Sequence, residues 1–239
     1  MLYIFSALQP PSLRLGLRGL FGGPCFFQGL IMRTSIYVDG FNLYFGALKR
    51  TNFKWLDIMS LCSNLLQPHN KIDSIKYFTA HVSGTAHDPH KPIHQQLYLR
   101  ALKHTTPETE IILGQFTTHK VTKKLVNPIQ GIRHAEIFET TEKGSDVNLA
   151  VHLLNDAWLD KYDCAVVISG DSDLAESIRL VKSYHRQKKV GVLSPGKRSM
   201  SRELKDASDF IKAISTSALQ NSQFPNVIPG TNITKPADW

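Results

Sequence analysis

The chain has little cysteine, and its three cysteines form no pair of the kind that marks a metal or redox site. Cys25, Cys62 and Cys164 include no C-x-x-C spacing and leave an odd count. This usage argues against a disulfide framework and against a zinc site, and it is typical of a reduced compartment. Cys164 lies in the pattern of a buried strand. We therefore expect a cytoplasmic protein.

The first 31 residues lack aspartate, glutamate and lysine altogether. Their only charges are Arg14 and Arg18, and glycine and proline interrupt them repeatedly. Their apolar runs are too short to span a bilayer, and the arginines follow the first apolar run, unlike those of a signal peptide. We interpret 1–31 as a non-domain extension before Met32, with a targeting segment as the alternative. No membrane partner is expected.

Composition and charge indicate a domain that binds a polyanion. The 239 residues are enough for one domain with a full core, and the formal charge is +8 with a sequence pI of about 9.4. A basic protein that also carries an acidic cluster suggests a phosphate-rich substrate. The alternative is a basic surface that only keeps the protein soluble. A homo-oligomer is compatible with the sequence.

From Met32 onward, apolar runs alternate with helical periodicity. Strands are predicted at 34–38, 75–80, 111–113, 164–168, 190–193 and 210–214. Helices are predicted after the first strand, at 55–66 and 93–104, from 145 and 173, and at about 199–207. Nearly continuous apolar strands indicate a parallel sheet covered on both faces, so we predict one α/β domain over 32–215.

Two segments lack this periodicity. Residues 117–135 are basic and are predicted to be irregular, and 216–239 are polar and are predicted to be a disordered tail. Ser145 is predicted to cap the helix that follows it. The helical spacing also predicts buried faces on two helices, formed by Ile93, Leu97, Ala101 and Leu102 and by Val147, Ala150, Val151, Leu154 and Trp158.

Four aspartates occupy places where an α/β protein holds a metal. Asp39 follows the run Ile36–Val38, Asp171 and Asp173 follow 165–168, and Asp146 opens a helix. Open parallel sheets bind ligands at the carboxyl ends of their strands. Converging carboxylates stay ionised together only around a cation, and hard oxygen ligands suit Mg²⁺ or Mn²⁺. Taken singly, each aspartate can instead be a turn residue or a helix cap.

Three motifs make the pattern specific. They are Tyr-Val-Asp-Gly-Phe-Asn, Lys-Gly-Ser-Asp-Val-Asn and Ser-Gly-Asp-Ser-Asp, which contain Asp39, Asp146, Asp171 and Asp173. In order and spacing they resemble the NYN family of PIN-like ribonuclease domains, including its LabA-type bacterial branch, over about 33–215. The resemblance implies a three-layer PIN-like fold and an acidic pocket of these four aspartates with Asn42. Ser169 matches the same pattern and is expected to orient a ligand.

The resemblance implies metal-dependent hydrolysis of RNA. Mg²⁺ or Mn²⁺ would polarise the phosphoryl oxygens and activate a water, and Asn42 would bind the ion or orient the phosphate. Basic residues that follow predicted strand ends are expected to flank the RNA path. They are Lys120, Lys123, Lys124, Lys143, Lys197 and Arg198. A solvated basic loop is the alternative.

Two other functions stay open. One is an RNA- or partner-binding NYN module without catalysis. The other is a small-molecule enzyme, because some LabA-type relatives carry the label 6-hydroxy-3-succinoylpyridine hydroxylase, although no flavin or NAD fingerprint is visible.

Three further patterns are weaker. The run 191–197 resembles a P-loop, but Arg198 replaces the Ser or Thr that would bind Mg²⁺. The histidines at 87, 90 and 94 are predicted to belong to a surface loop rather than to a zinc site. Asp171-Ser-Asp173 resembles the D-x-D of haloacid-dehalogenase-type phosphatases, which need later catalytic elements.

Overall fold

The central sheet has six parallel strands, and the first of them along the chain lies beside the fourth. The computed structural model describes residues 31–86, 88–196 and 201–239. The strands are β1 (Met32–Asp39), β2 (Asn70–Thr79), β3 (Thr109–Leu113), β6 (Cys164–Ile168), β7 (Lys189–Ser194) and β8 (Phe210–Ala213). Their order is β3-β2-β1-β6-β7-β8. The chain leaves β1 and β6 in opposite directions along the sheet, so a ligand-binding crevice is expected between their carboxyl ends.

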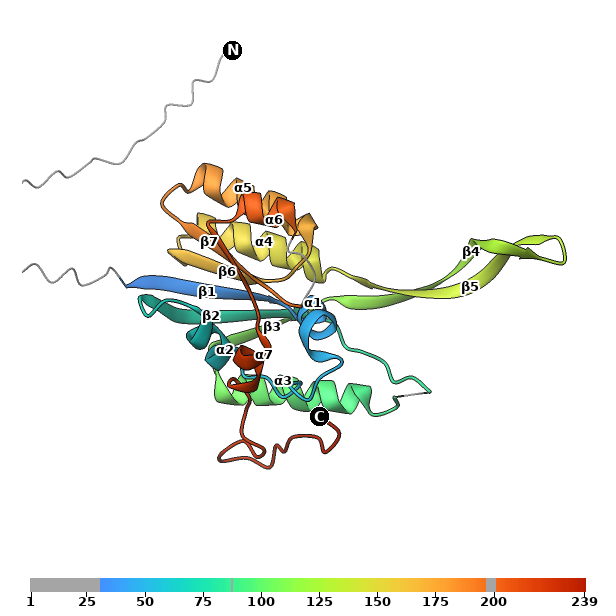
Figure 1. The fold of residues 1–239 in the computed structure, drawn as a ribbon, viewed down its shortest axis with the longest axis horizontal. Coiled ribbons are helices and arrows are strands. Elements are labelled where there is room, and N and C mark those ends of the chain that lie inside the picture. The colour runs from blue at the N-terminus through green and yellow to red at the C-terminus, as the bar shows by residue number, and fades with distance from the viewer. Residues whose placement is uncertain (1–30, 87, 197–200) are drawn as a thin grey trace, which may run out of the picture.

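Helices cover both faces of the sheet (Figure 1). On one face lie α2 (Ile58–Leu65), α3 (Lys91–Thr105) and α7 (Thr216–Gln220), and on the other lie α4 (Ser145–Trp158), α5 (Ala175–Tyr184) and α6 (Arg202–Ala207). The central strands alternate between the two layers: Ile36 and Val38 belong to the first core, and Tyr37 and Val167 belong to the second. The predicted three-layer α/β fold is confirmed.

The predicted strands and helices are present, with adjusted ends. β6 has the predicted bounds, β8 ends one residue earlier than predicted, and β1, β2, β3 and β7 start one to five residues earlier. The first predicted helix is split into α1 (Gly40–Leu43) and a π-helical turn (Tyr44–Leu48), and the short 3₁₀ turn η2 (Ser172–Leu174) precedes α5. Leu174, Ile178 and Val181 are buried. Cys62 and Cys164 are buried and free.

The prediction of an irregular segment at 117–135 is wrong. These residues belong to a long antiparallel hairpin of β4 (Gln115–Ile129) and β5 (Ile132–Lys143), here called the arm, which projects away from the sheet (Figure 1). Its two-residue turn has positive φ at both Gln130 and Gly131, the geometry that suits a hairpin. Because most side chains on both faces of the arm are exposed, the sequence has no alternating apolar signal.

The prediction of a disordered tail at 216–239 is also wrong. After α7 the chain returns across the first layer and buries Phe224, Ile228 and Ile233. The Trp55 indole Nε1 donates to the Pro225 carbonyl at 2.9 Å. Phe224, Ile228 and Ile233 are buried singly at irregular spacing, so no periodicity marks this segment in a polar sequence.

On two helices, the buried face differs from the one that the sequence predicts. On α3, Ile93 is exposed while Tyr98 and Leu99 join Ala101 and Leu102 inside. On α4, the buried residues are Ser145, Leu149, Leu153, Asp156 and Ala157. Of the predicted stripe, Val147, Val151 and Trp158 face outward, and Trp158 is 74% exposed, while Ala150 and Leu154 are partly buried against the core. The buried face of α4 combines Leu149, Leu153 and Ala157 with Asp156, which carries an ion network.

That network joins α4 to the sheet. The Asp156 side chain is 2% exposed, and its Oδ2 accepts from Lys76 Nζ at 2.6 Å and from the Tyr37 hydroxyl at 2.8 Å. Lys161 Nζ lies 3.2 Å from the other oxygen, and Lys76 Nζ lies 3.1 Å from His152 Nδ1. A buried carboxylate is costly without charged and hydrogen-bonding partners. The network of Asp156 with Lys76 and Tyr37 therefore fixes the position of α4 on the sheet.

In the part of the chain that the structure describes, no helix has the length and apolarity needed to cross a membrane.

Candidate active site

The crevice between β1 and β6 contains the first and third sequence motifs. Asp39 is the last residue of β1 and caps α1, and Ser169, Gly170 and Asp171 follow β6. Gly40 lets α1 start directly against β2, because a Cβ there would lie 2.7 Å from the Tyr77 ring and 2.8 Å from the Phe78 carbonyl oxygen. A side chain at this position would push Asp39 away from β6.

Hydrogen bonds lock these two strand ends together. The Asp39 carboxylate accepts from the Asn42 backbone N–H and from the Ser169 hydroxyl, both at 2.9 Å. Asn42 Oδ1 accepts from the Gly170 N–H at 2.9 Å, and Ser169 Oγ accepts from the Asp171 N–H at 3.1 Å. Ser169 is therefore fully buried support for Asp39, and the Asn42 amide has its oxygen engaged and its NH₂ group left to donate.

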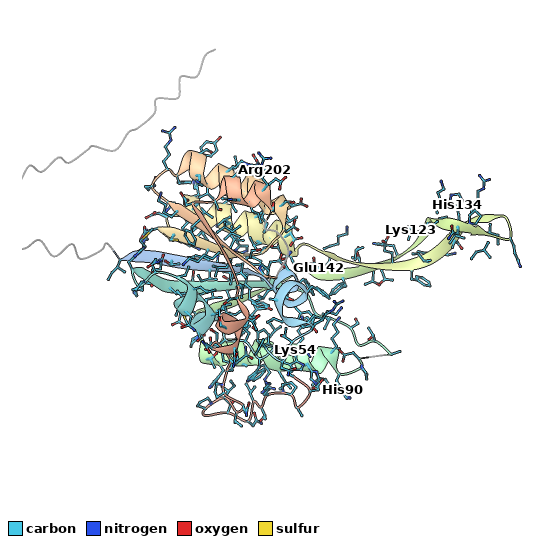
Figure 2. All side chains as sticks on the ribbon, viewed as in Figure 1. Lys54, His90, Lys123, His134, Glu142 and Arg202 are labelled. Carbon is cyan, nitrogen blue, oxygen red and sulfur yellow. The ribbon has the colours of Figure 1, made fainter. Side chains whose placement is uncertain are left out.

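The second motif reaches the crevice from α4 and the base of the arm. Gly144, with φ of 102°, precedes α4, so the predicted Ser145 cap is wrong and Ser145 is the first helical residue. Its N–H and hydroxyl both donate to Glu142 Oε1, at 3.1 and 2.7 Å. This arrangement caps the helix with an acid from β5 and brings the charge of Glu142 close enough to Asp146 to raise its pKa. Figure 2 shows Glu142 at the base of the arm.

The four acids Asp39, Asp146, Asp171 and Glu142 line one cleft of about 430 Å³. We call it the acidic cleft. Its other walls are Phe41, Asn42, Phe45, Val82, Lys91 and Phe116. Phe41 and Phe116 meet edge to face, 5.7 Å between ring centroids, where α1 touches the arm. Asp173 is exposed and is not among the lining residues, although its charge acts on Asp146.

Burial and mutual repulsion raise the pKa of two of these acids. Burial raises the pKa of Asp39 to about 6; the bonds from Asn42 and Ser169 oppose this, and the charges of Asp146 and Asp171 add to it. The pKa of Asp146 is also raised, first by burial and then by the charges of Asp171, Glu142 and Asp173. A cation in the cleft would reverse these effects.

The donor chemistry of the acidic cleft fits Mg²⁺ or Mn²⁺. All four acids offer hard oxygen atoms and repel one another. Among the described residues, however, no group of three or more His, Cys, Asp or Glu side chains is arranged to hold an ion. Both Asp39 oxygens are already engaged in hydrogen bonds. Mg²⁺ commonly uses one or two carboxylates with waters and substrate phosphates, so a closed protein cage is not required.

Three of the basic residues predicted to follow strand ends lie within a strand of the arm instead. Lys120, Lys123 and Lys124 are within β4 itself, and Figure 2 shows Lys123 far out along the arm from Glu142. Lys120 pairs with Glu136 at 2.6 Å and Lys123 pairs with Glu139 at 3.1 Å. Lys143 ends β5 at the base of the arm. Lys197 and Arg198 lie outside the described residues, as do His87 and almost all of the 1–31 extension.

Three contributors to the cleft escape prediction from the sequence. Glu142 and Phe116 come from the arm, and they line the cleft only because the hairpin starts and ends there. Lys91 comes from the first turn of α3, after an irregular loop. Glu142 stands three residues before Ser145, but a capping acid on the preceding strand is not a standard sequence signal. Lys91 has no local signal, because only the tertiary fold brings it to the cleft.

The raised pKa of Asp39 predicts a pH-dependent effect of Asp39→Asn on stability. Its pKa lies above the unfolded value of about 3.9, so without metal its ionisation costs stability progressively from about pH 4 to above 6, by about 3 kcal/mol in all. In EDTA, the advantage of the variant in melting temperature should be small near pH 4.5 and reach several degrees at pH 7.5.

Added Mg²⁺ should remove or reverse that advantage, because only the wild type keeps the full charge that binds the ion. Thermal melts of the full chain at both pH values, with EDTA or Mg²⁺, provide the measurement. A difference between the two proteins that is independent of pH would contradict the assigned burial and charge of Asp39.

Comparison with known proteins identifies the family of the chain. The NYN domain family model matches residues 33–217. The chain is 32% identical over 236 residues to the 6-hydroxy-3-succinoylpyridine 3-monooxygenase HspA of Pseudomonas putida, with 87% of this chain and 75% of that protein covered. The fold is similar to the crystal structure of a protein of unknown function from Vibrio parahaemolyticus, with a TM-score of 0.51, 18% identity, and coverage of 82% and 99% of the two chains. The chain therefore belongs to the NYN domain family.

Proposed function

We propose that the protein is a metal-dependent ribonuclease that hydrolyses RNA phosphodiester bonds in the acidic cleft. The observation that carries the proposal is the convergence of Asp39, Asp146 and Asp171 at the strand ends of an NYN domain, whose family suggests nuclease-type chemistry. A formal charge of +8 on a chain whose cleft is acidic supports a polyanionic substrate drawn toward a bound cation.

Each residue has a distinct proposed role. Asp39, Asp146 and Asp171 would hold Mg²⁺ or Mn²⁺, with Glu142 adding negative charge. Bound there, the ion would polarise the phosphoryl group and lower the pKa of the attacking water. Ser169 fixes the Asp39 carboxylate. The Asn42 NH₂ group and Lys91 would donate to phosphate oxygens, and the phenylalanine pair Phe41 and Phe116 would keep one side of the cleft dry. From outside the cleft, the negative charge of Asp173 would raise the pKa of Asp146.

A cleavage assay tests the proposal directly. Full-length protein is incubated with 5′-labelled single-stranded RNA in Mg²⁺, in Mn²⁺ and in EDTA, with DNA of the same sequence beside it. We expect RNA cleavage that depends on the metal. A chain that binds RNA but does not cut it under any of these conditions would be the binding module instead.

One observation favours a second function. The similar protein from Pseudomonas putida bears the name of a monooxygenase of a hydroxylated pyridine, at 32% identity. In the same preparation, depletion of 6-hydroxy-3-succinoylpyridine can be followed with NADH and a flavin added. Depletion without RNA cleavage would replace the ribonuclease by a small-molecule oxygenase.

The arm is proposed to guide RNA toward the acidic cleft. Between 119 and 134 it carries Lys120, Lys123, Lys124 and Arg133 and no acid, while its acids lie nearer the base. The ion pairs of Lys120 and Lys123 are exposed, so they are weak and can be exchanged for phosphates.

The salt dependence of RNA binding measures this contribution. Changing Lys123 and Lys124 together to Ala should lower the log–log slope of affinity against salt by about 1.4, since each single-strand phosphate contact contributes roughly 0.7. Affinity for metal should stay unchanged. Lys71 and Lys189 are a matched control, because both are exposed and begin strands at the opposite edge of the sheet. An equal slope in both double variants would remove the arm from the RNA path.

A further inference from the structure

A second pocket adjoins the acidic cleft and has aromatic walls. It lies among α1 with the following π-helical turn, β2, α3 and the segment after α7, and its cavity volume is about 110 Å³. One water needs only about 10–15 Å³, so the pocket has room for a flat ring. Its aromatic lining consists of Phe41, Tyr44, Phe45, Tyr77, Tyr98 and Trp239. We call it the aromatic pocket.

The two hollows share a wall. Phe41, Phe45, Val82 and Lys91 line both the aromatic pocket and the acidic cleft. A ligand with a phosphate in the cleft can therefore place its next group in the aromatic pocket without leaving the protein surface.

The polar lining of the pocket carries charges of both signs. Lys54 and Lys91 line it together with Asp88 and Asp238, and within the described residues neither lysine has a carboxylate oxygen within 4 Å, so Lys91 at the shared wall can contact a phosphate while the ring lies among the aromatic side chains. Gln95 is fully used: its NH₂ group donates to the Ala80 carbonyl at 2.9 Å and its oxygen accepts from the Val82 N–H at 3.0 Å. The wall at Gln95 is thus fixed in place, while the two lysines keep donors for a ligand.

Trp239 closes the pocket from the segment after α7. Its ring meets His94 at 5.6 Å, Trp55 at 6.1 Å and Tyr98 at 6.2 Å between centroids. The neighbouring Asp238 Oδ1 lies 3.6 Å from His94 Nε2. The segment after α7 therefore completes a binding wall in addition to covering the core.

We infer that the aromatic pocket binds the heteroaromatic base of the nucleotide next to the phosphate that is held in the acidic cleft. Bases stack on aromatic side chains with little sequence preference, at about 1–3 kcal/mol each. Lys91, at the shared wall, lies where it can contact the phosphate that links the two nucleotides. This inference rests on the proposed ribonuclease function, because it assumes a phosphate in the cleft.

Nucleotide binding in Mg²⁺ tests the inference without needing catalysis, because AMP and CMP contain no phosphodiester bond to cleave. Calorimetry with the full chain compares AMP, CMP, ribose 5-phosphate and nicotinate. AMP and CMP should bind, ribose 5-phosphate should bind at least tenfold more weakly, and Trp239→Ala should weaken AMP about tenfold. Trp158→Ala, on the exposed face of α4, should bind AMP as the wild type does. Phe45→Ala is a second probe, because Phe45 is 55% exposed and its loss should leave the fold intact.

The outcomes separate the two proposals. Equal binding of ribose 5-phosphate and AMP, or unchanged AMP affinity in both Trp239→Ala and Phe45→Ala, would overturn the base-binding pocket even if RNA is cleaved. Nicotinate that binds more tightly than the nucleotides would also overturn it, in favour of a free heteroaromatic acid. AMP binding that depends on Trp239 in a protein that cleaves no RNA would keep the pocket and refute the ribonuclease.

Discussion

Asp171→Asn should lower the rate of RNA cleavage by about a hundredfold or more, with the fold intact. Asp171 lines the acidic cleft, and its charge raises the pKa of both Asp39 and Asp146. Losing a group that organises a metal commonly costs 10–100-fold, and losing a charged ligand costs at least the upper end of that range. The Asp171 Oδ1 that accepts from the Asp173 N–H at 3.0 Å has a counterpart in asparagine, so the local turn should survive.

A matched variant separates chemistry from capping. Asp57 also caps a helix, α2, through a side-chain oxygen that accepts from the Ser60 N–H at 3.1 Å, and it does not line the cleft. Asp57→Asn should cleave RNA at the wild-type rate. Asp173→Asn should have a smaller effect than Asp171→Asn, because Asp173 is exposed and does not line the cleft. Wild-type cleavage by Asp171→Asn would show that the assigned site is wrong.

Asp156→Ala should destabilise the protein by about 3–5 kcal/mol, which is the usual cost of removing one partner from a buried ion pair. The change leaves Lys76 with its ammonium largely buried, 10% exposed, and removes the acceptor of the Tyr37 hydroxyl. The melting temperature should fall by roughly 6–20 °C, at about 2–4 °C per kcal/mol. Asp206→Ala is the control, since it breaks only the exposed pair with Arg202 and should cost under about 1 kcal/mol.

The same network has a defined pH dependence. Burial alone would raise the pKa of Asp156, but hydrogen bonds from Lys76 and Tyr37 hold it below its usual value. A lowered folded pKa gives stability that is present above the unfolded pKa of about 3.9 and is lost as the pH falls through the folded value. The destabilisation by Asp156→Ala should therefore be full at pH 7 and shrink below about pH 4. A loss below 1 kcal/mol at pH 7 would contradict the structural role of the network.

The sequence predicts the sheet and the strand-end acids well, because both depend on local patterns. Apolar runs mark the strands, and Asp39 and Asp171 follow directly after two of them. Parallel strands bring their carboxyl ends to one edge, so the convergence of these acids follows from the fold class. Family motifs then add Asn42 and Ser169, whose hydrogen bonds join the two strand ends.

The parts that the sequence does not predict are those held by long-range contacts. The arm is exposed on both faces, so no alternating burial marks its strands. Phe224 and Ile228 are buried singly in a polar segment, and α4 buries Asp156 while exposing Trp158. Each case reverses the rule that apolar periodicity marks the interior, because an ion network, a projecting hairpin or a single inserted side chain decides the packing.

The position of Mn²⁺ in crystals of the full chain tests the central claim most directly. Crystals soaked in Mn²⁺ and measured by anomalous diffraction should show a peak in the acidic cleft, with oxygen atoms of Asp39, Asp146 or Asp171 as ligands. Asp171→Asn crystals should show a weaker peak or none. A strong peak elsewhere, with the cleft empty at a saturating concentration of Mn²⁺, would contradict a metal-dependent ribonuclease centred on these aspartates.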